Sequence, residues 1–151
     1  MDISNLSEFV KSLVPEAEIK EGKQFPEITV SPCCLPLIAK ALKDNSDTQC
    51  DYLINLTGVD YGTDLGVIYH LASSKLKHIF VFKTKTPERE NPVLESVCEI
   101  WQTAEFHERE VYDLLGIKFN NHPDLRRLFL DDTWGFPLRK DYVDDVNKVC
   151  K

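Results

Sequence analysis

The sequence contains no apolar run long enough to cross a lipid bilayer. Its most apolar stretch, CCLPLIAKAL at residues 33–42, is much shorter than the ~20 residues that a membrane helix needs, and it includes Pro36 and Lys40. The first ten residues, MDISNLSEFV, carry an acidic residue and no basic cluster ahead of an apolar run, so they do not resemble a secretory signal. These absences predict a soluble, cytoplasmic chain.

Basic charge and metal-binding cysteine patterns are also scarce. The formal net charge of -7 disfavours a nucleic acid partner, because phosphate binding needs a basic face. No CxxC spacing occurs, so zinc or iron–sulfur ligation by this chain is not expected. Adjacent cysteines rarely reach disulfide geometry without strain, so we expect reduced thiols. The five cysteines are Cys33, Cys34, Cys50, Cys98 and Cys150.

The common catalytic motifs are missing as well. The chain has no HExxH, no GxSxG, no phosphate-binding glycine loop and no GxGxxG. His107 lies next to Glu108, but adjacent residues of a helix point about 100° apart and do not easily serve one site. His122 precedes Pro123, which favours a turn-forming role. We predict no catalytic residue; the alternative of a different class is a stand-alone hydrolase that uses His107 or His122 with Glu108.

What the sequence does contain is the pattern of one α+β domain. Apolar spacing predicts a helix that Pro15 ends and a second helix with Leu35, Ile38, Ala39 and Leu42 on one face. Two short strands are expected within residues 16–31. CDYLINLTGVDY, DLGVIYHLAS and LKHIFVFKTK predict three strands, and the short loops between them make these strands antiparallel neighbours. We expect two layers, a mixed and mainly antiparallel sheet with helices on one side.

A third helix is predicted to begin at Ser96, since Ser96 and Glu99 have the spacing of a capping box, and to end at Gly116. A break is expected near Thr103. Its apolar stripe is formed by Trp101, Ala104, Val111 and Leu115. The sequence after Gly116 is rich in proline and charge and has little periodicity. We therefore assign residues 1–118 to the α+β domain and residues 119–151 to an extended, irregular interaction segment of the same domain.

The stretch HEREVYD, residues 107–113, places charges on the third helix. Helical spacing puts Glu108 on the apolar stripe and Arg109 away from it. A buried carboxylate needs a cation and hydrogen bonds, because desolvation alone would favour its neutral form. Our hypothesis is that Glu108 pairs with an arginine of the segment and so attaches the segment to the helix. The alternative is a set of solvent-exposed pairs worth ~0–1 kcal/mol each. The basic candidates are Arg126, Arg127, Arg139 and Lys140.

Residues 108–142, EREVYDLLGIKFNNHPDLRRLFLDDTWGFPLRKDY, closely resemble the signature of the 30 kDa-type (C-type) subunit of bacterial respiratory complex I. The chain departs from that signature at Phe106, where a tryptophan is frequent, and at Leu115, where an aromatic is frequent. The positions at the expected spacings are Glu108, Arg109, Glu110, Tyr112, Asp113, Gly116, His122, Pro123, Asp124, Arg127, Gly135, Pro137, Leu138, Arg139, Lys140 and Asp141.

This resemblance implies a non-catalytic peripheral-arm subunit of a proton-translocating NADH:quinone oxidoreductase, which supports assembly and the quinone-site subunit. The signature residues, with Arg126 and Trp134, would form the partner interface. The resemblance implies no cofactor in this chain; NADH, flavin, iron–sulfur clusters and quinone would belong to partners, chiefly the D-type and iron–sulfur subunits. It implies a peripheral place at the cytoplasmic face of the inner membrane, which it contacts only indirectly. A related membrane-bound hydrogenase is the alternative host.

Overall fold

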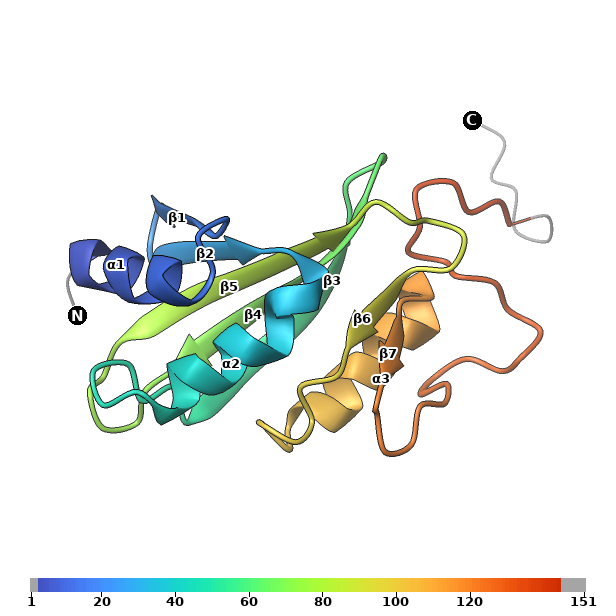
Figure 1. The fold of residues 1–151 in the computed structure, drawn as a ribbon. Coiled ribbons are helices and arrows are strands. Elements are labelled where there is room, and N and C mark those ends of the chain that lie inside the picture. The colour runs from blue at the N-terminus through green and yellow to red at the C-terminus, as the bar shows by residue number, and fades with distance from the viewer. Residues whose placement is uncertain (1–2, 145–151) are drawn as a thin grey trace.

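The computed structural model describes residues 3–144 and shows three helices and seven strands among them (Figure 1). A single 3-10 turn, η1, leads into the second helix. Within residues 3–144, no helix combines the length and the apolar character needed to cross a membrane. The elements in chain order are α1 (Ile3–Leu13), β1 (Glu18–Glu21), β2 (Pro26–Val30), η1 (Pro32–Cys34), α2 (Leu35–Asp44), β3 (Tyr52–Asp60), β4 (Leu65–Ala72), β5 (Ile79–Thr86), β6 (Val93–Glu95), α3 (Ala104–Leu115) and β7 (Lys118–Asn120).

The main sheet has five strands in the order β1-β2-β5-β4-β3. The strands β3, β4 and β5 follow one another as antiparallel neighbours, as the short loops predict. The strand β2 is parallel to β5, because the chain passes through α2 before it returns to the sheet as β3. The predicted mixed, mainly antiparallel sheet is confirmed. The small parallel pair of β6 and β7 was not predicted, since a strand of three residues has no detectable periodicity.

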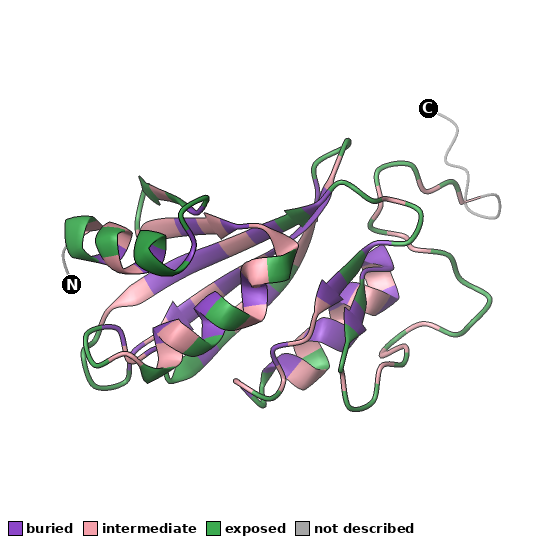
Figure 2. Ribbon diagram, in the orientation of Figure 1, coloured by how far each residue is buried: buried purple, intermediate pink, exposed green. Residues whose placement is uncertain are grey.

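The core lies between the sheet and the helices that cover one of its faces, as predicted (Figure 1 and Figure 2). Alternate residues of a strand point to opposite faces, and β4 therefore directs Leu65, Val67, Tyr69 and Leu71 into the core. The helix α2 contributes the four apolar residues that the sequence pattern placed on one face, Leu35, Ile38, Ala39 and Leu42. The apolar periodicity of the sequence thus predicted the buried faces of both the sheet and the helix that covers it.

The start of the third helix differs from the prediction. The helix α3 begins at Ala104, next to the break expected near Thr103, and not at Ser96. Ser96 does not cap it, because Ser96 continues the extended path of β6 and donates its backbone N–H to the carbonyl of Asn120 at 2.9 Å. The end of the helix is as predicted, since Gly116 adopts the left-handed conformation with φ of 75°.

Gly58 of β3 sets how closely α3 approaches the sheet. A Cβ atom on this residue would lie 2.4 Å from Cδ1 of Leu115 and 2.9 Å from Cγ1 of Val111. Both atoms belong to the buried face of α3. The absence of a side chain at Gly58 therefore positions the helix that carries the charged signature.

Gly58→Ala should lower the free energy of unfolding by about 1–3 kcal/mol, because overpacking forces α3 away from β3. Urea denaturation followed by circular dichroism measures this change. Thr57→Ala, at the exposed neighbouring position of β3, is the matched control and should stay within about 0.5 kcal/mol of the wild type. Equal stability of Gly58→Ala and Thr57→Ala would contradict the close approach.

Candidate interaction surface of the carboxyl-terminal segment

Asp113 of α3 binds the carboxyl-terminal segment, which we define as residues 121–144. Its side chain is fully buried. The oxygen Oδ2 accepts hydrogen bonds from the backbone N–H groups of Leu128, Phe129 and Leu130 at 3.2, 2.7 and 3.1 Å. The oxygen Oδ1 accepts one from Nη1 of Arg127 at 3.1 Å. Burial alone would raise the pKa of Asp113, but these donors outweigh it and hold the pKa below its ordinary value.

Arg127 extends this contact across the segment. Nη1 also donates to the backbone carbonyls of Asp113 and Gly135, at 3.0 and 3.2 Å. Nη2 donates to the carbonyl of Trp134 at 2.6 Å, and the guanidinium lies over the ring of Phe136 with 5.2 Å to its centroid. One side chain thus joins the helix to a turn that follows seven and eight residues later.

Arg109 of α3 binds backbone carbonyls of the carboxyl-terminal segment. Although its spacing places it off the apolar stripe of α3, the residue is only 5% exposed, because the carboxyl-terminal segment covers that side of the helix. Nε donates to the carbonyl of Arg126 at 3.2 Å and Nη2 to the carbonyl of Arg127 at 3.0 Å. In the charged signature, Arg109 satisfies the carbonyls of the segment and Asp113 satisfies its amides.

Asp60, at the end of β3, and Arg89, in the loop after β5, hold the far end of the segment. Arg89 donates to Asp60 in a bidentate pair at 2.8 and 3.0 Å. The backbone N–H of Lys140 donates to the same carboxylate at 2.9 Å, and Arg89 also pairs with Asp141 at 3.3 Å. The hydrogen bonds from Arg89 lower the pKa of Asp60. Sequence reasoning missed both Asp60 and Arg89, since no local pattern links positions so far apart.

Arg139 closes the end of α3. Nε donates to the carbonyl of Leu115 at 2.6 Å, where a cation also complements the helix dipole, and Nη1 donates to the carbonyl of Arg89 at 2.8 Å. Gly116 makes room for this arrangement, because a Cβ atom there would lie 2.6 Å from Cε2 of Phe136 and 2.8 Å from Nη2 of Arg139. The glycine is needed for both its conformation and its lack of a side chain.

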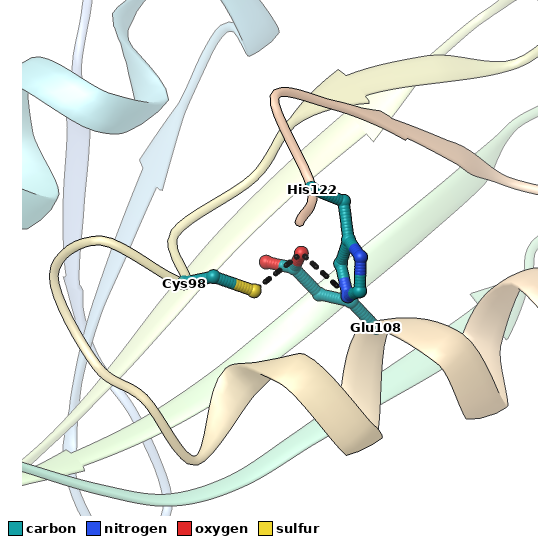
Figure 3. Close-up of side chains that lie close together, drawn as sticks. All are labelled: Cys98, Glu108 and His122. Carbon is teal, nitrogen blue, oxygen red and sulfur yellow. Dashed lines mark hydrogen bonds and ion pairs between the residues drawn. The ribbon is translucent and has the colours of Figure 1, made fainter. Parts of the chain in front are cut away.

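Glu108 is buried as predicted, but the predicted arginine partner is wrong (Figure 3). Ser96 Oγ donates to Oε2 at 2.6 Å, Val97 N to Oε1 at 2.8 Å and Cys98 Sγ to Oε2 at 3.3 Å. These donors come from the turn between β6 and α3, which Glu108 faces, whereas the arginines of the segment are engaged elsewhere. Burial raises the pKa of Glu108 because the three hydrogen bonds only partly offset desolvation.

Cys98, Glu108 and His122 bring three potential metal ligands within 4.8 Å of one another (Figure 3). The hydrogen bonds of His122 argue against ligation. Its Nδ1 accepts the N–H of Asp124 at 3.0 Å, so Nε2 carries the ring proton and donates to the carbonyl of Glu105 at 3.0 Å. Both ring nitrogens are therefore occupied by hydrogen bonds. Oε2 of Glu108 lies 4.0 Å from Nε2, so the three side chains form a packed polar cluster. The same occupancy leaves His122 no lone pair for base catalysis.

The outer side of the segment is apolar at several places. Phe129, Trp134 and Leu138 are 68%, 40% and 59% exposed, although their backbones are held from within. Residues 121–144 loop around α3 on the side away from α1 and α2 (Figure 1). Exposed aromatic and aliphatic side chains on a fixed backbone are typical of protein–protein contact surfaces.

The other predicted site residues are more peripheral. Asp124 and Arg126 form an exposed ion pair at 2.8 Å, next to the exposed Pro123. Glu110 and Leu138 line a cavity of about 120 Å³ between β3 and α3. Tyr112 and Pro137 are half-buried. The predicted set therefore includes residues that fix the segment, residues that face outward and residues in half-buried positions between these two groups.

Residues 28–147 match the model of the protein family described as respiratory-chain NADH dehydrogenase, 30 Kd subunit. The chain belongs to this family. It is 52% identical over 110 residues to the C/D-type NADH-quinone oxidoreductase subunit of Phocaeicola vulgatus, an alignment that covers 72% of this chain and 21% of that protein. It is 41% identical over 133 residues to the C-type NADH-quinone oxidoreductase subunit of Chlorobium phaeobacteroides, with coverages of 85% and 74%.

This 30 kDa-family chain spans about a fifth of the length of its C/D-type relatives. Its fold also occurs in a chain of the membrane-bound sulfane sulfur reductase, an archaeal respiratory membrane complex. The two chains superpose with a TM-score of 0.78 at 23% identity, over 95% of this chain and 86% of that one. The family signature quoted from residues 108–142 lies inside the range that the family model matches.

Asp113→Asn should destabilise the 30 kDa-family chain by about 2–3 kcal/mol, because it removes the buried negative charge and makes an NH2 group face either Arg127 or the bound amides. Urea denaturation gives the stability, and limited proteolysis with mass spectrometry should find new cleavage between residues 124 and 144. The control is Asp132→Asn, since the Asp132 side chain is fully exposed and lies 4.0 Å from the same arginine. A protease pattern equal to that of the wild type would refute the attachment by Asp113.

Glu108→Gln should change how stability depends on pH. The raised pKa of Glu108 means that its stabilising contribution is complete below the ordinary value of 4.5 and is lost as pH rises through the folded-state pKa. The free energy of unfolding of the wild type, minus that of Glu108→Gln, should therefore fall as pH increases from about 4 to 8. Denaturation curves across this range test the sign, with the exposed Glu99→Gln as the control for loss of one charge. A difference that grows with pH would contradict the assignment.

Proposed function

We propose that this chain is a non-catalytic C-type subunit of a proton-translocating NADH:quinone oxidoreductase, complex I, and that its carboxyl-terminal segment binds the neighbouring subunits. One observation carries the proposal. Buried charges fix the backbone of the segment, while Phe129, Trp134 and Leu138 extend into solvent. A long irregular segment held in one shape loses little further conformational freedom on binding, which favours assembly.

The D-type subunit, which forms the quinone pocket, is the main partner that we propose. Relatives named as C/D-type subunits of NADH-quinone oxidoreductase carry both designations in one protein, and this chain aligns with 21% of the length of one of them. Two proteins joined in some organisms commonly lie side by side where they are separate. Iron–sulfur subunits are the further partners, and the flavin, clusters, NADH and quinone belong to these partner subunits. The complex places the chain at the cytoplasmic face of the inner membrane, which it contacts only through them.

The polar groups of the signature support a structural role over catalysis. Glu108 accepts three hydrogen bonds, and both ring nitrogens of His122 are engaged. Asp113 and Arg127 are likewise committed to backbone groups of the segment. Glu108, Asp113 and His122 are thus used to maintain the shape of the chain.

A tagged copy purified gently from its native membranes, with the co-purifying chains identified by mass spectrometry, tests the proposal. We expect the D-type subunit together with flavin- and iron–sulfur-containing subunits that oxidise NADH. Recovery of a nickel hydrogenase subunit would instead assign the chain to a related membrane-bound hydrogenase. Recovery of no partner would overturn the proposal.

The double variant Phe129→Ser and Leu138→Ser tests the contact surface in the same experiment. Truncation of a hot-spot residue costs about 2 kcal/mol or more, so loss of one such contact should lower recovery of the D-type subunit at least about tenfold. The control is Leu37→Ser on α2, which removes a leucine of similar exposure, 53% against 59% for Leu138. The melting temperature of each variant should match the wild type, which separates lost binding from unfolding. Equal recovery with both variants would place the contact elsewhere.

A further inference from the structure

Cys33 and Cys34 lie where β2 leads into α2, on the turn η1. Cys33 is exposed, and Cys34 is half-buried against the edge of the core. Their sulfur atoms are 3.6 Å apart. Both are free thiols, so two adjacent sulfur atoms are presented together at the start of a helix.

The distance between the two sulfur atoms suits chelation. A disulfide needs about 2.0 Å between its sulfur atoms. Two thiolates at about 2.3 Å from one shared soft atom lie about 3.3 Å apart at a bond angle of about 90° and about 3.8 Å apart at the tetrahedral angle. The observed 3.6 Å falls within this range, so the thiols can hold one such atom between them without a rearrangement of the backbone.

The local hydrogen bonds favour reaction at this pair. Ser31 Oγ lies 3.2 Å from the Cys33 sulfur. Hydrogen bonds from the Ser31 hydroxyl and from the Cys34 thiol lower the pKa of Cys33. The thiolate is the form of cysteine that binds soft ions, so Cys33 is the first of the two to react.

We propose that Cys33 and Cys34 form a two-thiol site for trivalent arsenicals, thiophilic metalloid compounds that bind two adjacent thiols in one ring. Within residues 3–144, the only grouping of three potential metal ligands found is that of Cys98, Glu108 and His122. A zinc ion needs four ligands, whereas a monosubstituted arsenical needs only two thiols in addition to its own carbon substituent. The pair therefore matches the ligand requirement of the arsenical.

The reaction is balanced without an oxidant or a reductant. An arsenical oxide, R–As=O, reacts with the thiols of Cys33 and Cys34. Two As–S bonds form, the As–O bond breaks, and both thiol protons leave with the oxygen as water. Arsenic stays trivalent, and the sulfur atoms are not oxidised. The ring that forms contains both sulfur atoms and the backbone between the two residues, which makes it more resistant to single thiols than two separate bonds are.

Phenylarsine oxide added to the purified full chain tests the site. Because Cys150 lies outside the described residues, all samples carry Cys150→Ser. Intact-mass spectrometry should show one phenylarsenic group per chain, retained in excess glutathione and removed by dithiothreitol. Cys33→Ser and Cys34→Ser should each lower the glutathione-resistant adduct at least tenfold, while Cys98→Ser, which removes another half-buried thiol, should retain it.

Two results would overturn the proposal. One is that glutathione removes the phenylarsenic group from the chain with both cysteines as readily as from Cys33→Ser. The other is a chain whose mass shows that the pair is already oxidised and that binds no arsenical without prior reduction. Cys33 is exposed, so circular dichroism should show Cys33→Ser folded, and peptide mapping of the adduct provides an independent location. The experiment does not depend on the partner subunits, so it tests the two-thiol site independently of the proposed function in complex I.

Discussion

The carboxylate of Asp113 is the contact on which the shape of the carboxyl-terminal segment depends. Residues 121–144 form neither helix nor strand, so their backbone groups have no regular ladder to satisfy them. Asp113 accepts three consecutive amides, and Arg109 donates to the two carbonyls that precede them. Hydrogen bonds of this kind are stronger than neutral ones because one partner is charged. The backbone of an irregular stretch is thus satisfied by two charged side chains of one helix.

This arrangement explains what the charged signature does in the folded chain. Because side chains of α3 bind the backbone of the segment, the side chains of Phe129, Trp134 and Leu138 can extend into solvent. The contacts at Asp60 and Arg89 fix the far end of the segment to the main sheet. Hydrogen bonds therefore connect the sheet, α3 and the segment to one another.

Two carboxylates of α3 show how environment decides the effect of burial. Glu108 and Asp113 are both fully buried, yet the pKa of Glu108 is raised and that of Asp113 is lowered. Desolvation is the leading cause acting on each. Asp113 has a guanidinium partner and three amides, whereas the donors to Glu108 are a hydroxyl, one amide and a thiol. At Asp113 the arginine and the amides outweigh desolvation, whereas at Glu108 the donors do not.

The sequence by itself determined the elements that periodicity encodes. Apolar spacing located α1 and α2, alternation located β3 to β5, and Gly116 marked the end of α3. The long signature at residues 108–142 also identified the family. These features are local, so neighbouring residues carry all the necessary information. The spacing also predicted burial of Glu108 correctly, because it depends only on the face of one helix.

Only the tertiary structure decided which charges meet. Asp60 and Arg89 are 29 residues apart, and Asp60 and Lys140 are 80 apart. Glu108 took its donors from the turn after β6, and Arg127, one of the basic candidates for pairing with Glu108, bound Asp113 instead. Every buried carboxylate attracts any donor within reach, and the sequence does not say which donors the packing of β3, β6 and α3 brings close. The choice of charged partners is therefore a property of the folded chain. The sequence predicts only that a buried carboxylate needs such partners.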